Sequence, residues 1–578
     1  MAHIPNLRRR PLAAKSAATS FPYIDTLFDY GKFLRGAGDG IGHLPSHVAH
    51  EPIAVVGSGV GGLVAAYELL RAGARDVTIF EASARPGGRM YSRPFTATHP
   101  EFLAELGAMR FPPSEFGLFH YLDALGIAHS PNFPDPGKVL TNIGYQGRTY
   151  VWKADSEHPP AIFAKVAQGW DAFVQEGCRL ADGVQLPAPV SITAALQAGQ
   201  REQAVAAWRS YIQAFENVSF YSGLVSIFTA PQPPGGQRWQ AADFELFGAL
   251  GLGSGGFGPL YQIGFLELLR LIVNELETDQ ELVMGGIESL AKAFCEQRFH
   301  GRRLYDRIRL ATTVTGVSHA HERRPLVSFG HGRAERFARV VVAATNRAMN
   351  IDMGLGYEVG VLGANQRSAL SGVHMTSSSK VFVMTRDKFW QRHRDLPANI
   401  QTDTLVRGVY CLDYAPNDPH APGVVLLSYT WEDDSTQQLG LRDKRARVQR
   451  LVQDVARTNP DFARHVVPIN EDYATYTQVI DWELEPHYYG AFKLNLPGAD
   501  ELSRRLFYQF LACKEPATDP FVYLAGDSQS FTGGWIEGAV QTGVNAACAV
   551  IRSLGGSLYT LDNPVDAARP TAYDYNPE

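Results

Sequence analysis

The chain has 578 residues, which is too long for one hydrophobic core and predicts two or three domains. Apolar residues make up 45% of the composition, and 53 basic against 59 acidic residues leave a formal net charge of -6 at pH 7. No lysine- or arginine-rich run interleaves with aromatic residues, so nucleic acid is not an expected partner. The sequence has no stretch of about 18 apolar residues, so we do not expect a membrane span.

The first fifty residues are rich in glycine, alanine and serine, and we expect them to form an arm that packs on the body, with an amphipathic piece at residues 23–34. Residues 8–10 are three arginines, but no adequate apolar core follows them, which favours a solvated basic tail over an export signal. The five cysteines are scattered without metal-ligand spacing. They predict reduced, mostly buried thiols in a cytoplasmic protein, and no metal site.

A glycine-rich turn follows the first strongly predicted strand. Residues 53–56 are an apolar run typical of a buried parallel strand, and residues 63–70 continue as a helix. The glycines between them permit a tight turn and close approach of a pyrophosphate, which would lie on the helix N-terminus. These glycines are Gly57, Gly59, Gly61 and Gly62.

A second apolar strand, residues 77–80, ends in Glu81, at the distance where a carboxylate accepts hydrogen bonds from ribose hydroxyls. A carboxylate there disfavours a 2′-phosphate, so NADP is not expected. The glycine pattern alone is equally compatible with packing or with nucleotide binding. A second glycine-rich segment, residues 523–538, favours nucleotide binding, because it completes one site from both ends of the chain.

The rest of the chain alternates between helical and strand-like patterns. Residues 161–277 have helical spacing, and residues 312–317 and 339–344 are strand-like and are predicted to return to the parallel sheet. A second, mostly antiparallel sheet is predicted from three alternating or β-branched runs, residues 380–384, 408–412 and 423–430. Residues 522–525 and the helix after Gly534 are expected to close the nucleotide domain.

Residues 84–89, Ala-Arg-Pro-Gly-Gly-Arg, follow soon after Glu81, and their glycines permit close backbone approach while Arg89 can reach a pyrophosphate oxygen. Together with residues 105–113 this combination favours FAD over NAD. From about residue 23 to residue 556 the chain resembles the flavin amine oxidase family, within it the L-amino-acid oxidases, and most closely the bacterial tryptophan 2-monooxygenases. The most specific matching stretches are residues 108–113, 244–248, 253–257, 406–414, 427–434, 490–493 and 534–541.

The resemblance implies catalytic roles for four residues. Arg110 would clamp the substrate carboxylate with two hydrogen bonds, and the Tyr429 phenol would donate to the same carboxylate. Lys380 would hold a water against flavin N5, and Trp535 would face the isoalloxazine ring and stack beside the substrate side chain. The alternatives are a surface ion pair for Arg110, an ordinary core position for Tyr429 and a strand-edge lysine for Lys380.

The resemblance also implies the binding residues. Asp527 would accept a hydrogen bond from the ribityl chain, amides after Gly534 would stabilise negative charge at flavin N1, and Val314 would contact adenine through its main chain. The predicted cofactor-binding set is Gly57, Gly59, Gly61, Gly62, Glu81, Ala82, Arg89, Gly107, Ala108, Met109, Arg110, Val314, Asp527, Gly534, Trp535 and Ile536. The predicted substrate-binding set is Arg110, Tyr429, Phe257, Trp482, Gly534 and Trp535, with Trp431 as a further aromatic candidate.

Three features depart from the pattern of the tryptophan monooxygenases. Asp527 stands where they carry a cysteine, Gly258 replaces a bulkier residue, and Tyr488 and Tyr489 replace smaller residues. The last two changes are expected to reshape the substrate pocket.

The predicted fold is α/β, or α+β overall, with a Rossmann-like FAD-binding domain, a mixed-sheet substrate-binding domain and a helical insertion, as in amine oxidases. The predicted limits are an arm at 1–50, a discontinuous FAD-binding domain at 51–115, 280–347 and 505–556, a substrate-binding domain at 116–160 and 348–504, the insertion at 161–279 and a tail at 557–578.

The predicted activity is FAD-dependent oxidation of an L-amino acid, L-tryptophan or another aromatic, by hydride transfer to flavin N5 and oxidative decarboxylation to the amide. The alternative is an L-amino-acid oxidase that gives the keto acid, ammonia and hydrogen peroxide, with broad or basic preference; Asp243, Glu245 or Glu267 would then meet a cationic side chain. A pyridine-nucleotide dehydrogenase and a non-catalytic flavin-binding scaffold are more distant alternatives. The expected partners are a small L-amino acid, O2 and further copies of the chain in a homodimer or higher homo-oligomer.

Overall fold

The computed structural model describes residues 19–252, 256–319, 324–357 and 361–567. Its central element is a five-stranded parallel sheet in the order β14-β3-β2-β18-β26. The strands are β2 (Ile53–Val56), β3 (Val77–Phe80), β14 (Ile308–Arg309), β18 (Arg339–Val342) and β26 (Val522–Leu524). They come from the three stretches that the sequence analysis assigns to the cofactor domain, whose exact limits stay a prediction.

Both faces of this sheet are covered, which explains why its strands are almost entirely apolar. Helices α2 (Val60–Arg71), α10 (Glu288–Glu296) and α18 (Ile536–Ser553) pack with Ile53, Val55 and Ile79 on one face. A three-stranded antiparallel sheet and two helices pack with Ala54 and Val56 on the other. These elements are β15 (Val314–His319), β16 (Pro325–Phe329), β17 (Arg333–Arg336), α11 (Asn346–Ile351) and α12 (Ala364–Gly372).

The prediction that residues 312–317 return to the parallel sheet is wrong. They begin β15, which pairs antiparallel with β16, whereas the parallel sheet is extended by the two residues of β14. The physical reason lies in the pattern of burial. Val314 and Val317 are buried and Thr315 is exposed, as in a strand with one covered face, while β14 is too short to give a periodic signal.

A second, mixed sheet has seven strands in the order β24-β20-β23-β22-β21-β7-β8, antiparallel except where β21 pairs with β7. Its strands are β7 (Thr141–Tyr145), β8 (Arg148–Trp152), β20 (Ser378–Thr385), β21 (Asn399–Thr402), β22 (Gly408–Leu412), β23 (Gly423–Trp431) and β24 (Thr477–Asp481). Helices α13 (Phe389–Arg392), α15 (Lys444–Thr458) and α16 (Pro460–Ala463) cover one face, so the other is left for the site.

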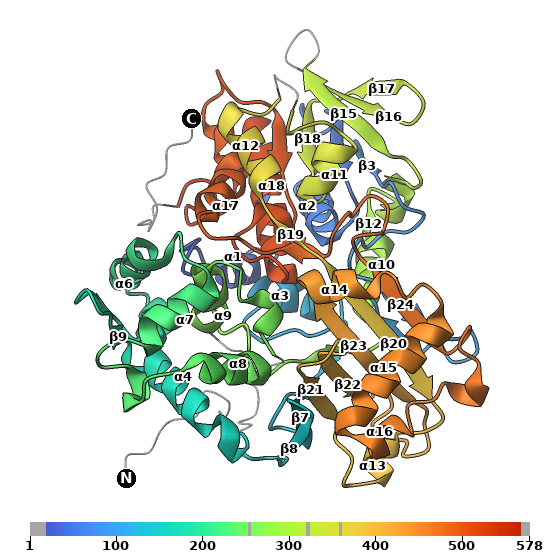
Figure 1. Cartoon of the computed structure of the whole chain (residues 1–578). Coiled ribbons are helices and arrows are strands. Elements are labelled where there is room, and N and C mark those ends of the chain that lie inside the picture. The colour runs from blue at the N-terminus through green and yellow to red at the C-terminus, as the bar shows by residue number, and fades with distance from the viewer. Residues whose placement is uncertain (1–18, 253–255, 320–323, 358–360, 568–578) are drawn as a thin grey trace.

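A helical region lies beside this sheet (Figure 1) and has its own aromatic-rich core. It comprises η1 (Ala161–Phe163), α4 (Ala164–Glu176), α5 (Pro189–Gln197), α6 (Arg201–Phe215), α7 (Phe220–Phe228), α8 (Ala241–Leu250), η3 (Gly258–Leu260) and α9 (Phe265–Val273). This agrees with the helical spacing of residues 161–277. Residues 253–255 of the resemblance motif lie outside the described residues.

The N-terminal residues that are described pack on the body, but helix α1 covers only Tyr30–Gly36, less than the amphipathic piece predicted over residues 23–34. The Tyr30 hydroxyl donates to Asn545 of α18 (2.7 Å). At the other end of the chain, β27 (Ser557–Leu558) pairs with β1 (Gly42–His43). Residues 1–18, which include the arginine run at 8–10, lie outside the described residues.

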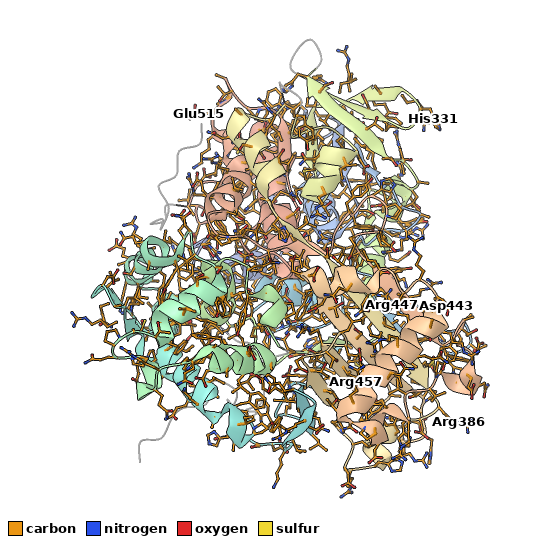
Figure 2. All side chains as sticks on the ribbon, in the orientation of Figure 1. His331, Arg386, Asp443, Arg447, Arg457 and Glu515 are labelled. Carbon is orange, nitrogen blue, oxygen red and sulfur yellow. The ribbon has the colours of Figure 1, made fainter. Side chains whose placement is uncertain are left out.

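Further short elements connect these layers. They are β4 (Ser92–Pro94), β5 (Leu103–Glu105), α3 (Phe116–Ala124), β6 (His129–Ser130), β11 (Leu282–Val283), β19 (Met375–Thr376), α14 (Glu432–Gln438), β25 (Phe492–Lys493), α17 (Asp500–Phe507), η7 (Tyr508–Lys514) and η8 (Asp527–Gln529). Figure 2 shows the polar side chains of His331, Arg386 and Glu515 at the periphery of the molecule. No helix among the described residues is long and apolar enough to cross a membrane.

A buried ion network joins the arm, the helical region and the C-terminal half. Arg270 of α9 donates to Asp25 (2.8 Å) and Glu267 (3.0 Å) and contacts Asp500 (2.5 Å), and Lys493 contacts Glu267 (3.0 Å). All five side chains are almost completely buried. Removing the arginine would therefore leave buried carboxylates without their main partner.

We predict that Arg270→Met lowers the stability of the protein by about 3–5 kcal/mol, since an uncompensated buried charge carries that cost. The urea midpoint of unfolding measures the loss. Arg392→Met is the control, because Arg392 pairs with Asp387 at the surface and should change stability by about 1 kcal/mol or less. Equal midpoints for the two variants would contradict a stabilising role of the network.

Candidate active site

The glycine turn between β2 and α2 is shaped by close backbone contacts. Gly57 has φ 97°, and a Cβ added there would lie 2.5 Å from the Ala343 carbonyl oxygen. At Gly62 an added Cβ would lie 2.0 Å from the Gly57 oxygen, so Gly62 serves the turn itself. Gly59 differs, because the nearest atom to its added Cβ is 4.0 Å away. It lines the cavity that follows.

A long cavity begins at this turn and encloses about 1310 Å³ of space between atoms, counting its mouth. Its wall combines the glycine turn, the end of β3 and the segment after β26, which is the arrangement that a dinucleotide needs. The predicted cofactor residues that line it are Gly57, Gly59, Gly61, Glu81, Ala82, Arg89, Gly107, Ala108, Val314, Asp527, Gly534, Trp535 and Ile536. Met109 and Arg110 lie instead in the wall of a second cavity.

Glu81 is fixed at the end of β3 by three donors. Its Oε2 accepts from the Ser58 amide (2.8 Å) and hydroxyl (2.7 Å), and Oε1 accepts from the Ser83 amide (2.8 Å). These bonds hold an oriented carboxylate at the cavity wall, where a ribose would need its acceptor.

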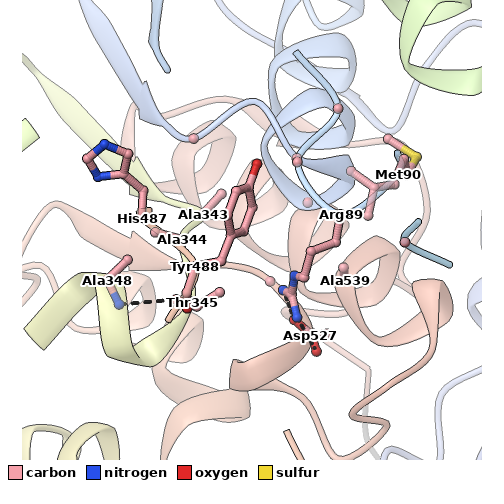
Figure 3. A pocket seen from close by; sticks show the side chains of 18 of the residues that line it. Arg89, Met90, Ala343, Ala344, Thr345, Ala348, His487, Tyr488, Asp527 and Ala539 are labelled. Carbon is pink, nitrogen blue, oxygen red and sulfur yellow. Dashed lines mark hydrogen bonds and ion pairs between the residues drawn. The ribbon is translucent and has the colours of Figure 1, made fainter. Parts of the chain in front are cut away.

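Arg89 and Asp527 both line this cavity, and their side chains bind each other directly (Figure 3). Arg89 donates to both oxygens of the Asp527 carboxylate, one at 3.1 Å, and to the Ala491 carbonyl oxygen (2.7 Å). The two groups predicted to bind the pyrophosphate and the ribityl chain thus hold one another in place. Their contacts with the cofactor stay predictions.

Lys380 lies on β20 and is only 2% exposed. Its ammonium donates to the carbonyl oxygens of Glu105 (3.0 Å) and Gly107 (2.5 Å) and lies 4.7 Å from the centre of the Tyr429 ring. Burial lowers the pKa of Lys380 to about 7, with the Glu105 carboxylate acting in the opposite direction. Lys380 is therefore poised to exchange a proton near neutral pH at the cavity wall.

A second cavity of about 700 Å³, open volume included, adjoins the first. The two share Ala108, Tyr429, Phe492, Gly534, Trp535 and Ile536 in their walls. Its remaining wall is apolar or aromatic apart from Arg110, Glu115 and Glu277, and includes Phe257, Leu260, Leu268, Leu271, Trp431 and Leu494. Trp482, predicted to contact substrate, lines only the first cavity, where its indole N–H donates to the Leu106 oxygen (2.9 Å).

Arg110 lines the second cavity next to Trp535, which both cavities share. Its guanidinium is 5.2 Å from the Trp535 ring centre, and it donates to both oxygens of Glu277 (3.0 and 3.4 Å). Tyr429 borders the same space, with its ring 4.8 Å from that of Trp431. The structure thus brings Arg110, Tyr429, Trp535 and Lys380 to one junction, although four separate segments supply them.

Sequence reasoning missed the two acids of the second cavity. Glu277 lies in the loop after α9, with no motif around it, and only the fold reveals it as the partner of Arg110. Glu115 is fully buried, its Oε1 accepts the Glu537 amide (2.9 Å), and burial raises its pKa. Its place two residues after the matched stretch 108–113 was the only available signal.

The acids suggested for a cationic substrate side chain are not in either wall. Asp243 binds Lys165 (2.6 Å), Glu245 accepts from Tyr145 (3.2 Å), and Glu267 belongs to the buried network. That suggestion was wrong, because sequence proximity to Phe257 did not bring these side chains to the cavity. Tyr488 and Tyr489, expected to reshape the substrate pocket, also do not line the second cavity, and Tyr488 lines the first.

A family model described as flavin containing amine oxidoreductase matches residues 60–551. The chain belongs to this family. FAD is its cofactor, and the protein is a flavin-dependent oxidase or monooxygenase. The residues that line the first cavity, the open space at Gly59 and the oriented Glu81 carboxylate fit a bound FAD.

Several relatives of this flavin amine oxidoreductase are similar over nearly their full length. Tryptophan 2-monooxygenase of Pseudomonas savastanoi is 48% identical over 94% of this chain and 97% of that protein. The enzyme of the same name from Pantoea agglomerans pv. gypsophilae is 47% identical over 97% and 99%. A phenylalanine 2-monooxygenase precursor from a Pseudomonas species is 26% identical over 93% and 91%.

Solved structures of lower identity share the fold. A variant of putrescine oxidase aligns with TM-score 0.62 at 18% identity, over 87% of this chain and 99% of that one. Cyclohexylamine oxidase from Brevibacterium oxydans aligns with TM-score 0.61 at 17% identity, over 88% and 100%. The predicted amine oxidase fold is thereby confirmed.

We predict that Gly59→Ala yields a folded protein that has lost most of its flavin. The protein has room for the added methyl, whereas a cofactor that approaches the backbone closely does not. Absorbance near 450 nm per mole of purified protein measures the effect, and the melting temperature checks the fold. Gly440→Ala, also with space around it, is the control. Full flavin content in Gly59→Ala would contradict close approach at this turn.

Proposed function

We propose that this flavin enzyme oxidises L-tryptophan, or another aromatic L-amino acid, with O2, and that L-tryptophan gives indole-3-acetamide, CO2 and water. The observation that carries the proposal is the second cavity, where Arg110, Tyr429 and Trp535 line a chamber whose wall is apolar or aromatic apart from Arg110 and the acids Glu115 and Glu277. An indole ring suits such a chamber, and a carboxylate suits the guanidinium. The tryptophan 2-monooxygenases that the chain resembles at 47–48% identity support the same substrate.

Arg110 and Tyr429 would fix the substrate carboxylate, so that the α-carbon lies at the boundary between the cavities. Trp535 and Phe257 would hold the side chain, and the apolar wall would exclude water from it. Lys380, at the wall of the first cavity, would hold a water molecule or a proton beside the reacting atoms. FAD, when bound, accepts the hydride and passes the electrons to O2.

The competing outcome is release of the imino acid, which water then converts to the keto acid and ammonia, while oxygen is reduced to hydrogen peroxide. A basic substrate is disfavoured by charge. Glu277 is already paired with Arg110, and the remaining wall of the second cavity is apolar apart from Glu115 and the Tyr429 phenol. Retention of the imino acid against the apolar and aromatic wall of the second cavity would favour the amide.

We further propose that the enzyme acts in the cytoplasm, in keeping with five free, buried cysteines. The expected homodimer or higher homo-oligomer also stays a prediction.

The proposal predicts that anaerobic L-tryptophan bleaches the flavin much faster than L-lysine or L-arginine does. Under air, mass analysis of the product should give indole-3-acetamide. Faster bleaching by a basic amino acid, or indole-3-pyruvate as the main product, would contradict the proposal.

Arg110→Ala should raise the Kd for L-tryptophan by about 10–100-fold, since a charge-assisted hydrogen bond contributes about 1.5–3 kcal/mol. The flavin should remain bound, because Arg110 does not line the cofactor cavity. Anaerobic titration of flavin reduction gives the Kd. Arg392→Ala, at the surface, is the control. A variant with wild-type Kd would refute the carboxylate clamp.

A further inference from the structure

The segment His487–Tyr489 crosses the wall of the cofactor cavity in a strained conformation. His487 has φ 68° and Tyr489 has φ 55°, both in the left-handed region that favours glycine. Such a backbone conformation persists only where its surroundings hold it. Tyr488, between them, lines the cavity together with His487.

Asp352, directly after α11, ties down both strained residues. Its Oδ1 accepts from the Tyr489 hydroxyl (2.6 Å), and its Oδ2 lies 3.0 Å from His487 Nδ1. The Thr345 hydroxyl donates to the Tyr488 carbonyl oxygen (3.1 Å), and Arg347 donates to that of Tyr489 (2.5 Å). All these anchors come from the short segment that follows β18, at the carboxyl edge of the parallel sheet.

The Tyr488 side chain lies among groups suited to a phosphate and a ribose. In Figure 3 its ring projects from the wall in the space between His487 and Arg89. Burial raises the pKa of Tyr488 to about 12, and the nearby Glu81 carboxylate also raises it. Arg85 and Arg89 act in the opposite direction. The hydroxyl therefore keeps its proton at neutral pH and can donate it in a hydrogen bond.

The Tyr488 ring is also fixed from the side. It packs edge to face on Trp482, with 5.1 Å between ring centres and 79° between planes. A tyrosine fixed in backbone and ring, beside the glycine turn, Glu81 and Arg89, is preorganised to bind a ligand.

We propose that Tyr488 is a cofactor-binding residue whose hydroxyl donates to the ribose–diphosphate part of FAD, and that Asp352 is the positioning residue that holds it there. Phosphate oxygens are strong acceptors, and this side of the cavity also presents the N-terminus of α2 and Arg89. The proposal concerns retention of FAD and does not depend on which amino acid the enzyme oxidises.

The proposal is tested by diluting the purified holoenzyme and measuring the release of FAD. The rise of flavin fluorescence reports this release and gives the Kd for FAD. Tyr488→Phe removes only the hydroxyl and should raise the Kd for FAD at least about 10-fold, as loss of a hydrogen bond to a charged group does. Asp352→Ala frees both strained residues and should also weaken FAD binding about 10-fold. Tyr473→Phe, outside both cavities, is the control and should bind FAD as the wild type does.

A Kd for FAD within twofold of the wild type in Tyr488→Phe would overturn the role of the hydroxyl. An unchanged Kd in Asp352→Ala would overturn the positioning role. If Asp352→Ala does not fold, Asp352→Asn replaces it, because the amide keeps one acceptor oxygen and loses the other. Circular dichroism and the melting temperature separate loss of cofactor from loss of fold.

Discussion

The close packing of α2 against α18 is the constraint on which the site depends. A Cβ added to Gly543 would lie 2.6 Å from the Gly61 oxygen, and one added to Gly61 would lie 3.1 Å from the Gly526 nitrogen. Two helices from opposite ends of the chain can therefore approach only because no side chain separates them. This contact brings Gly534, Trp535 and Ile536 to the cavity that the first glycine turn opens.

A second constraint is the charge buried where the two cavities meet. The Lys380 amine and the Arg110 guanidinium are largely buried, and each is held by oxygens of the protein, carbonyls for Lys380 and the Glu277 carboxylate for Arg110. Burial favours a neutral Lys380, while the Glu277 carboxylate keeps Arg110 charged. Arg110 therefore offers a positive charge to a substrate carboxylate, and Lys380 offers an amine that can exchange a proton near neutral pH. Both suit the oxidation of an amino acid.

Local patterns in the sequence predicted most of the framework. The strands at 53–56, 77–80 and 408–412 and the helical spacing after residue 161 are set by burial of their own side chains, so periodicity reveals them. The pairing of residues 312–317 was mispredicted, and β14 was missed, because two residues carry no period. Arg110, Tyr429 and Trp535 were proposed from stretches that match the family, and Lys380 from the same resemblance. Glu277 and the strained segment around Tyr488 depend on contacts between distant segments that no local pattern encodes.

The most direct test of the central claim is a crystal structure of the holoenzyme with indole-3-propionate, which keeps the carboxylate and the ring of tryptophan but has no amine to oxidise. The account predicts an isoalloxazine ring between Lys380 and Trp535, with the ligand carboxylate at about 3 Å from the Arg110 guanidinium and the Tyr429 hydroxyl. A flavin ring outside the junction, or a ligand carboxylate away from Arg110, would contradict it.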